Sequence, residues 1–347
     1  MANQNVRIPK FFPDIINHLM ATGSAQNDNF DLISGTDLIT TLNAGSEAEL
    51  FDMNWLNQVH FETSASATTR ADHILLNIDT GGDYTIDFIA ILNHNFNSAD
   101  AKIRVCHSDT ESNVNNVVKM EDGSATAISG VTKVVNVNTS SSSNNIIVPS
   151  SNGSTVFTFT ASDDRYWGIQ IEGDSTFDSS QDAKMACVLI GESYSLPFAP
   201  NLSLKRTIKY DGVSVQESLG GQRYATSTQL GKQYLASTNK SPFTTATSQA
   251  KIYNGRLGYE FTMSYLNANQ VMPEYYSTVI ADNTEDTVVS DLYNRVLGNR
   301  IPFIFTQDST SQSESDYMMA RFVDNNFTMT QTATDIYDIT MRLEEEF

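Results

Sequence analysis

The chain has 347 residues and a formal net charge of -20, with 41 acidic against 21 basic residues. This excess of acid argues against binding to nucleic acid or to an anionic membrane, because both require clustered Lys and Arg. The length predicts two domains, each large enough to bury a core without disulfides or metals.

Neither cysteine has a predicted redox function. Cys106 and Cys187 each lie in an apolar alternating run, which predicts two buried small hydrophobic residues. The N-terminal sequence MANQNVRIPK has no apolar signal core, and no stretch approaches the roughly eighteen apolar residues of a membrane span. We therefore expect a soluble protein made in a cytosol, without a membrane partner.

Residues 1–29 are expected to form an N-terminal arm or a short helix. A helix following Pro13 would carry its apolar residues on one side, namely Ile15, Ile16, Leu19 and Met20.

Residues 30–195 contain short alternating apolar runs such as HILLNI, AKIRV and RYWGIQI, separated by clusters of Gly, Asn, Asp and Ser. This pattern predicts strands at the spacing of a β-sandwich or jelly roll. The polar stretch 138–154 is expected to be a long loop between two of its strands.

A second domain is predicted over 196–347, after the proline-containing segment YSLPFAPNLSL. RTIKY and VSVQE flank Asp211-Gly212 and predict a hairpin with a type I′ turn. The long strand RLGYEFTMSYL should place Phe261 and Met263 in the core. The fold class is therefore mainly β, an N-terminal jelly-roll sandwich followed by a C-terminal β-sandwich domain carrying one α-helix.

That helix is predicted near residues 282–298. Asp282 precedes Glu285 as in a capping box, and Gly298 suits the left-handed residue after the last turn. The apolar stripe comprises Val288, Val289, Leu292, Tyr293, Val296 and Leu297.

The chain ends in IYDITMRLEEEF, which has the alternation of a half-buried strand. We expect this strand to be central in its sheet and buried against Phe261, Met263 and the helix. Its buried side chains would be Tyr337, Ile339, Met341 and Leu343. The residues Glu344, Glu345 and Glu346 follow the apolar run and are expected to be exposed and to contact another subunit or a neighbouring protein.

No catalytic, metal or cofactor site is predicted. The five histidines form no HxxxH or HxH set, and no cysteine or carboxylate spacing completes a zinc or EF-hand site. Nucleophile-elbow, P-loop and aromatic-rich basic motifs do not occur. The acidic pair Asp163-Asp164 is interpreted as solvated surface rather than a glycosidase pair.

Two interpretations of Asn93, His94 and Asn95 remain open. As a binding site, His94 would line a sugar pocket and the two amides would hydrogen bond to hydroxyls. As structural residues, all three would satisfy loop backbone groups at a strand end. Trp167 is expected in the core, because Ile169 and Ile171 share its parity.

Over residues 200–347, the series YDGVSVQESLGGQRY, RLGYEFTMSYL, LYNRVLGN, IPFIF, YMMARF and ITMRLEEEF resembles distal tail and minor tail proteins of long-tailed bacteriophages. This resemblance implies a compact β domain that oligomerises as a ring, with a hexamer favoured. It also implies neighbouring tail proteins as partners, synthesis in the cytoplasm of the bacterial host and the virion tail as the location.

The N-terminal half has a resemblance of its own. IDFIAILNHNFNSADAKIRV, DDRYWGIQIEG and VLIGE are similar to the galactose-binding-like jelly roll of the discoidin type. Three functions therefore stand as hypotheses. The first is a structural ring or adaptor protein of a phage tail, at the distal tail or baseplate. The second is a carbohydrate-binding protein that attaches to a host surface glycan, and the third is a head decoration protein.

Overall fold

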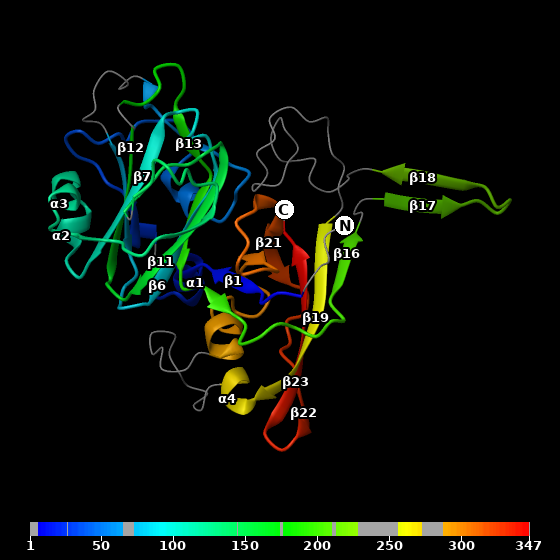
Figure 1. Cartoon of the computed structure of the whole chain (residues 1–347). Coiled ribbons are helices and arrows are strands. Elements are labelled where there is room, and N and C mark those ends of the chain that lie inside the picture. The colour runs from blue at the N-terminus through cyan, green and yellow to red at the C-terminus, as the bar shows by residue number, and fades with distance from the viewer. Residues whose placement is uncertain are drawn as a thin grey trace.

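The computed structural model describes residues 6–25, 27–64, 73–143, 145–173, 176–209, 213–227, 256–272 and 287–346. It is mainly β, with five antiparallel sheets and short helices among the described residues. Figure 1 shows a jelly-roll half and a second half side by side, with a hairpin projecting from the second half.

The jelly-roll half is a sandwich of two sheets. The larger sheet has the order β10-β7-β12-β5-β2, with β8 paired to β7. Its strands are β2 (Phe30–Leu32), β5 (His73–Asp79), β7 (Ala101–Ser108), β8 (Thr126–Ala127), β10 (Ile146–Ile147) and β12 (Tyr166–Gly173). The smaller sheet, in the order β14-β6-β11-β9, comprises β6 (Ile86–His94), β9 (Thr132–Val135), β11 (Gly153–Ser162) and β14 (Cys187–Gly191).

Smaller elements complete this half. A three-stranded sheet contains β3 (Leu42–Ala44), β4 (Val59–Phe61) and β13 (Ala183–Met185). The helical turns are η1 (Asn27–Asn29), η2 (Glu47–Leu50), α2 (Glu111–Val114) and α3 (Val117–Glu121). Trp167 is fully buried as expected, and its indole N–H donates to the Asp164 carbonyl at 2.8 Å.

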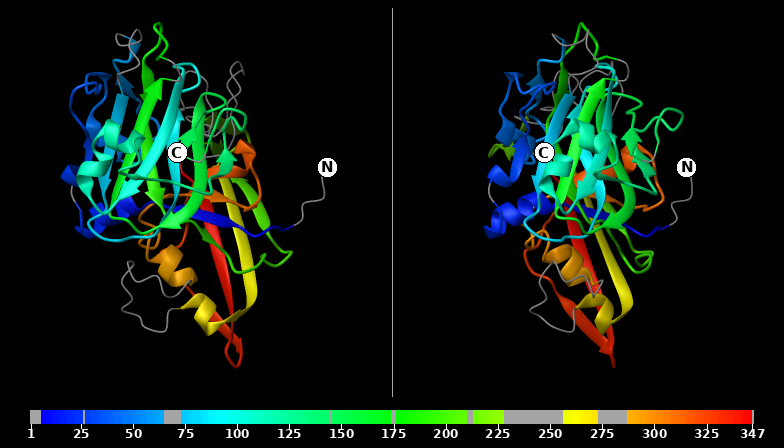
Figure 2. Two further views of the ribbon diagram at one scale, coloured as in Figure 1. Left: turned by 60° about the vertical axis from the view of Figure 1, so that its left-hand side comes forward. Right: turned by 90° about the vertical axis from the view of Figure 1, so that its left-hand side faces the viewer.

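The second half is built on an eight-stranded sheet, ordered β15-β1-β20-β21-β23-β19-β16 with β22 on β23. Its strands are β1 (Lys10–Pro13), β15 (Tyr194–Ser195), β16 (Lys205–Lys209), β19 (Arg256–Asn267), β20 (Phe303–Thr306), β21 (Tyr317–Phe322), β22 (Met329–Ala333) and β23 (Ile336–Glu345). The helical segments are α4 (Ala268–Val271), η5 (Val289–Tyr293) and η6 (Glu314–Asp316). In both views of Figure 2 the long pair β19 and β23 lies beneath the jelly roll.

The N-terminal segment belongs to both halves. β1 pairs with β20 and β15 in the second sheet, and only Asp14 separates its last residue, Pro13, from α1 (Ile15–Thr22). Asp14 caps this helix, because its Oδ2 accepts from the Asn17 N–H at 2.8 Å. Its Oδ1 accepts from the Ile190 N–H of β14, so the cap also ties the helix to the jelly roll.

The smaller jelly-roll sheet is buried on both faces. On β6, Ile89 and Ile91 belong to the core between the two jelly-roll sheets. The alternate residues, Phe88 among them, belong to a second core shared with the eight-stranded sheet, and the Phe88 ring lies 5.2 Å from that of Phe12. The three sheets therefore form consecutive layers. Burial on both faces explains why β6 and β14 have nearly continuous apolar sequences.

The C-terminal strand occupies an interior position, as predicted. β23 lies between β21 and β19, with Met341 opposite Phe261 and Ile339 opposite Met263. Ile339, Met341 and Leu343 are each about 1% exposed and share a core with η5, whereas Tyr337 is only partly buried.

The predicted hairpin across Asp211-Gly212 is wrong. β16 pairs with β19 along its whole length, while β17 (Val213–Glu217) pairs with β18 (Arg223–Ser227) in a separate two-stranded sheet. Pairing with β19 gives β16 an ion pair between Lys205 and Glu260 at 2.8 Å. The turn residues themselves lie outside the described residues.

The predicted α-helix is a π-helix at its centre. Asn294 N–H donates to the Val289 carbonyl, five residues back. The Gly298 N–H donates to the Tyr293 carbonyl and closes the C-terminal end beyond the π-helix. Val288, Leu292, Tyr293 and Val296 are buried and Gly298 is left-handed, as expected. Over two turns, an apolar stripe cannot distinguish the two helix types. The predicted cap at Asp282 and Glu285 lies outside the described residues.

No helix in the described part of the chain is both long and apolar enough to cross a membrane. Cys106 and Cys187 are buried free thiols, which confirms the prediction for both. Burial raises the pKa of Cys106 to about 11.

Candidate functional site

His94 is a buried residue at the end of β6, only 2% exposed. Its Nε2 lies 2.8 Å from Thr155 Oγ1, and its Nδ1 accepts from the Phe96 N–H at 3.3 Å. The imidazole also stacks on the Phe96 ring at 4.5 Å. Burial lowers the pKa of His94 to about 3, so the ring is neutral at pH 7.

The neighbouring amides hydrogen bond to the backbone of other segments. Asn93 is left-handed (φ 49°) and donates through Nδ2 to the Trp55 carbonyl at 2.8 Å. Asn95 donates to the Asp182 carbonyl at 2.8 Å and accepts from the Lys184 N–H at 2.7 Å. A sugar at this position would have to displace these bonds, so the geometry favours the structural interpretation.

The three C-terminal glutamates are less exposed than predicted. Glu345 is 3% exposed and its Oε2 accepts from the Leu257 N–H at 3.0 Å, because the inward parity of β23 continues beyond Leu343. Glu344 is partly buried, with its Oε1 3.2 Å from Lys209 Nζ. Glu346 is also partly buried and lies 3.0 Å from Arg321 Nε. The expectation of exposure was therefore wrong, and a neighbour contact stays a prediction.

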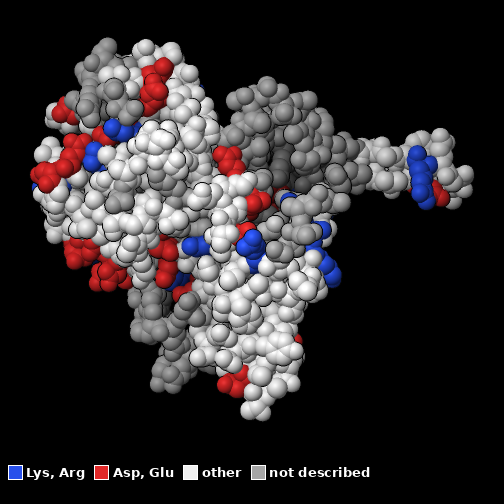
Figure 3. Space-filling model, viewed as in Figure 1, with Lys and Arg blue, Asp and Glu red and all other residues white. Residues whose placement is uncertain are grey.

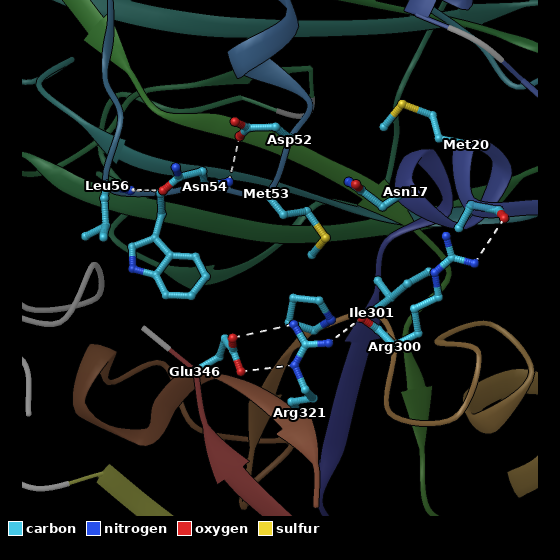
Figure 4. Close-up of a pocket in the computed structure, with 13 residues that line it drawn as sticks. Asn17, Met20, Asp52, Met53, Asn54, Leu56, Arg300, Ile301, Arg321 and Glu346 are labelled. Carbon is cyan, nitrogen blue, oxygen red and sulfur yellow. Dashed lines mark hydrogen bonds and ion pairs between the residues drawn. The ribbon is translucent and has the colours of Figure 1, made fainter. Parts of the chain in front are cut away.

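A pocket of about 520 Å³ opens where the two halves meet (Figure 4). One wall comes from the jelly-roll half, from α1 and the segment Asp52–Leu56 after η2. The opposite wall comes from the second half, from residues Arg300–Pro302, Arg321 of β21 and Glu346.

The pocket combines apolar surface with fixed polar groups. Met53, Trp55 and Ile301 line it and are buried, whereas Asp52 and Arg300 are exposed at its edge. Arg321 is held by Glu346 and by the Asn299 carbonyl at 2.9 Å, so its guanidinium is fixed in the wall.

Trp55 contributes an unusual group to this pocket. The residue is 5% exposed, and its indole N–H has no hydrogen-bond partner in the described structure. A buried donor of this kind normally has a partner. No local sequence pattern indicates this pocket, because its walls come from segments more than two hundred residues apart.

A second polar cluster covers part of the outer face of the larger jelly-roll sheet. His73, Glu121 and Glu172 lie close enough to share a cation. However, Glu172 Oε1 already lies 3.5 Å from Lys102 Nζ and 3.2 Å from Arg104 Nη2. These two cations compete with any metal for the carboxylate, so the cluster is a poor metal site.

No protein-family model and no curated protein matches this chain. Among solved structures, chitosan-binding module 1 of a chitosanase/glucanase from Paenibacillus sp. IK-5 matches at 12% identity and a TM-score of 0.29, covering 47% of this chain and 92% of the module. A truncated AlyQ with CBM32 and alginate lyase domains matches at 12% identity and a TM-score of 0.26, covering 69% of this chain and 49% of that one. Such low TM-scores assign neither a ligand nor a function to this chain.

Proposed function

We propose that this chain is a structural protein of a bacteriophage virion, a ring or adaptor component of the tail that associates with itself and with neighbouring tail proteins. The resemblance of the sequence segments in residues 200–347 to distal tail and minor tail proteins motivates the virion assignment. The projecting hairpin formed by β17 and β18 carries the proposal of assembly.

The hairpin extends away from both halves of the molecule (Figure 1). Residues 214–226 are all exposed, including the apolar side chains of Val215, Leu219 and Tyr224. A two-stranded hairpin alone is at best marginally stable in water. A partner that covers the hairpin would bury these apolar side chains and stabilise it. An exposed hairpin of this kind is therefore suited to contact another subunit.

Mass photometry of the full chain over a concentration series tests this proposal. We expect the 38.3 kDa monomer to give way to a closed oligomer as the concentration rises, with six copies favoured. A monomer at every concentration, together with no capture of any protein from a tail preparation, would contradict a role in assembly.

A second candidate is a carbohydrate-binding protein for host attachment, and the junction pocket favours it. Its buried Trp55 and Met53 offer apolar surface, while Asp52, Asn54 and Arg300 offer groups that hydrogen bond to hydroxyls. This composition suits a sugar better than the Asn93–Asn95 segment does.

Retention on host polysaccharide tests the second candidate. The variant Asp52→Ala/Asn54→Ala should lose retention, and Asp122→Ala on a distant exposed turn should keep it. Equal retention of both variants, or none by the wild type, would exclude this pocket as the glycan site.

A further inference from the structure

The jelly-roll wall of the junction pocket comes from a segment without Lys or Arg. Residues 11–69 hold eight of the 41 acidic residues and none of the 21 basic ones. Residues 1–199 as a whole hold 24 acidic and 9 basic residues, a net charge of -15, whereas residues 200–347 hold 17 and 12, a net charge of -5. In Figure 3, Asp and Glu gather on the jelly-roll half, and most of the visible Lys and Arg lie on the second half. A ligand that approaches this wall therefore meets a negative potential.

Three of the four charged side chains that line the pocket already have partners (Figure 4). Arg321 and Glu346 form an ion pair at 3.0 Å. Arg300 donates through Nη1 to the Ala21 carbonyl at 3.3 Å, in the last turn of α1, where the helix dipole favours a cation. The second half thus contributes two arginines whose charges are both engaged within the protein.

Asp52 is the fourth charged side chain, and it has no cationic partner. Its Oδ1 accepts from the Asn54 N–H at 2.7 Å, and the carboxylate makes no ion pair in the described part of the chain. Partial burial raises the pKa of Asp52, the hydrogen bond from Asn54 opposes that rise, and the like charge of Glu49 adds to it. A cationic group of a ligand would compensate this charge, which the protein itself leaves uncompensated.

Apolar surface and a free donor lie in the same wall. Met53 and Trp55 are buried beside Asp52, and Ile301 is buried in the opposite wall. The indole N–H of Trp55 has no partner in the described structure, so it is available to an oxygen of a ligand. An aromatic ring next to a carboxylate suits an ammonium group, because the ring face and the carboxylate both attract positive charge.

We propose that the junction pocket binds an amino sugar, with its ammonium group on Asp52 and an apolar face of its ring against Met53, Trp55 and Ile301. This inference rests on the carbohydrate-binding candidate above and names its ligand class. A neutral sugar would leave the charge of Asp52 uncompensated. An acidic sugar would add a negative charge beside it, in a molecule that already carries -20. Among glycans, the basic class therefore has the complementary charge.

A matched pair of ligands tests this inference. The tetramer of glucosamine carries amino groups, whereas the tetramer of N-acetylglucosamine has the same rings with uncharged amides. Isothermal titration calorimetry at pH 6 should show tighter binding of the glucosamine tetramer, on the order of ten-fold at low salt, and added salt should reduce this preference.

A matched pair of variants assigns the preference to one carboxylate. Asp52→Asn should abolish most of the preference, because the amide has nearly the same shape without the charge. Asp122→Asn makes the same change in net charge at an exposed residue on a distant turn and should keep the preference. Circular dichroism verifies that both variants fold.

The outcomes separate this inference from the candidate function on which it rests. Equal binding of the two tetramers, or a preference that Asp52→Asn leaves unchanged, would overturn the amino-sugar assignment and leave a glycan site standing. Displacement of the glucosamine tetramer by an equal concentration of spermidine, a polyamine without a sugar ring, would also overturn it and show a general cation site. Binding of neither tetramer, together with no retention on host polysaccharide, would overturn both the inference and the carbohydrate-binding candidate.

Discussion

Burial removes the His94 imidazole from water, and its hydrogen-bond partners, Thr155 and the Phe96 N–H, are uncharged. Because burial lowers its pKa from 6.5 to about 3, the folded protein binds fewer protons than the unfolded chain between these values. The stability that depends on neutral His94 is therefore complete above about pH 6.5 and is lost as the pH falls through this window.

His94→Gln keeps a polar group near Thr155 but does not titrate. We expect it to be less stable than the wild type at pH 7, by roughly 1–3 kcal/mol, through lost packing and hydrogen bonding. Its stability should decline less on acidification from pH 6.5 to 4, as measured by urea unfolding at each pH. Parallel pH profiles for the two proteins would show that His94 titrates normally. The comparison is needed because Asp14, whose pKa burial raises to about 6, acts in the opposite direction.

Gly191 lies at the point of closest approach between the N-terminal segment and β14. A Cβ at this position would lie 2.4 Å from the Pro13 carbonyl oxygen, a backbone atom with little freedom to move. We expect Gly191→Ala to destabilise the fold by roughly 1–3 kcal/mol in chemical denaturation. Gly220→Ala is a control, because the nearest atom to the added carbon is Ser218 Oγ at 4.0 Å and the backbone there is not left-handed, so only a small cost is expected. A wild-type midpoint for Gly191→Ala would contradict the tight junction.

At the scale of single elements, β23 shows what alternation can predict. Its apolar residues follow a period of two, and each of Ile339, Met341 and Leu343 lies in the core as that period requires. The same period continues to Glu345, but a glutamate at a chain end is normally expected in water. Its partner, the Leu257 N–H, comes from another strand and has no signature in the local sequence.

Glu345 and Glu344 should differ in how much each contributes to stability. Glu345→Ala should reduce stability by roughly 1–3 kcal/mol, because it leaves a backbone donor of β19 without its acceptor. Glu344→Ala removes an ion pair between a partly buried carboxylate and the exposed Lys209 and should cost less than about 1 kcal/mol. Thermal and urea unfolding of both variants provides the comparison, and equal costs would contradict the buried position of Glu345.

Other elements mark the limit of local patterns. The apolar stripe around Leu292 located a buried helix but could not reveal π-type hydrogen bonding. The prediction of strand pairing was likewise wrong for β16 and β17. Two strands that are adjacent in sequence and joined by a turn predict a hairpin unless another strand edge competes for one of them. The edge of β19, about fifty residues away in sequence, does compete, and β16 pairs with it instead of with β17.

At the scale of the whole molecule, the two halves share a core and are not simply connected by a linker. The nearly continuous apolar run of β6 was visible in the sequence, but the sheet that covers its second face was not. The junction pocket was invisible for the same reason, because its walls meet only after the three layers assemble. Composition and alternation therefore predict the β class and the buried strands, while contacts between distant segments decide where the pockets lie.

The shared core makes a prediction about dividing the chain. A fragment of residues 1–199 would expose Phe88 and its neighbours on the outer face of the four-stranded sheet, and it would leave β1 without β20. We expect this fragment to aggregate or to bind a dye for exposed apolar surface, although it contains every jelly-roll strand. A monomeric fragment with a cooperative thermal transition would contradict the three-layer core.

Two-dimensional class averages of the purified full chain, imaged at a concentration above the onset of association, test most directly whether it is the self-assembling structural protein we propose. We expect closed rings of identical subunits, with six-fold symmetry favoured and hairpins lying between neighbouring subunits. Fields of separate two-lobed particles with free hairpins, from a sample that is retained on host polysaccharide, would contradict it and favour the carbohydrate-binding alternative.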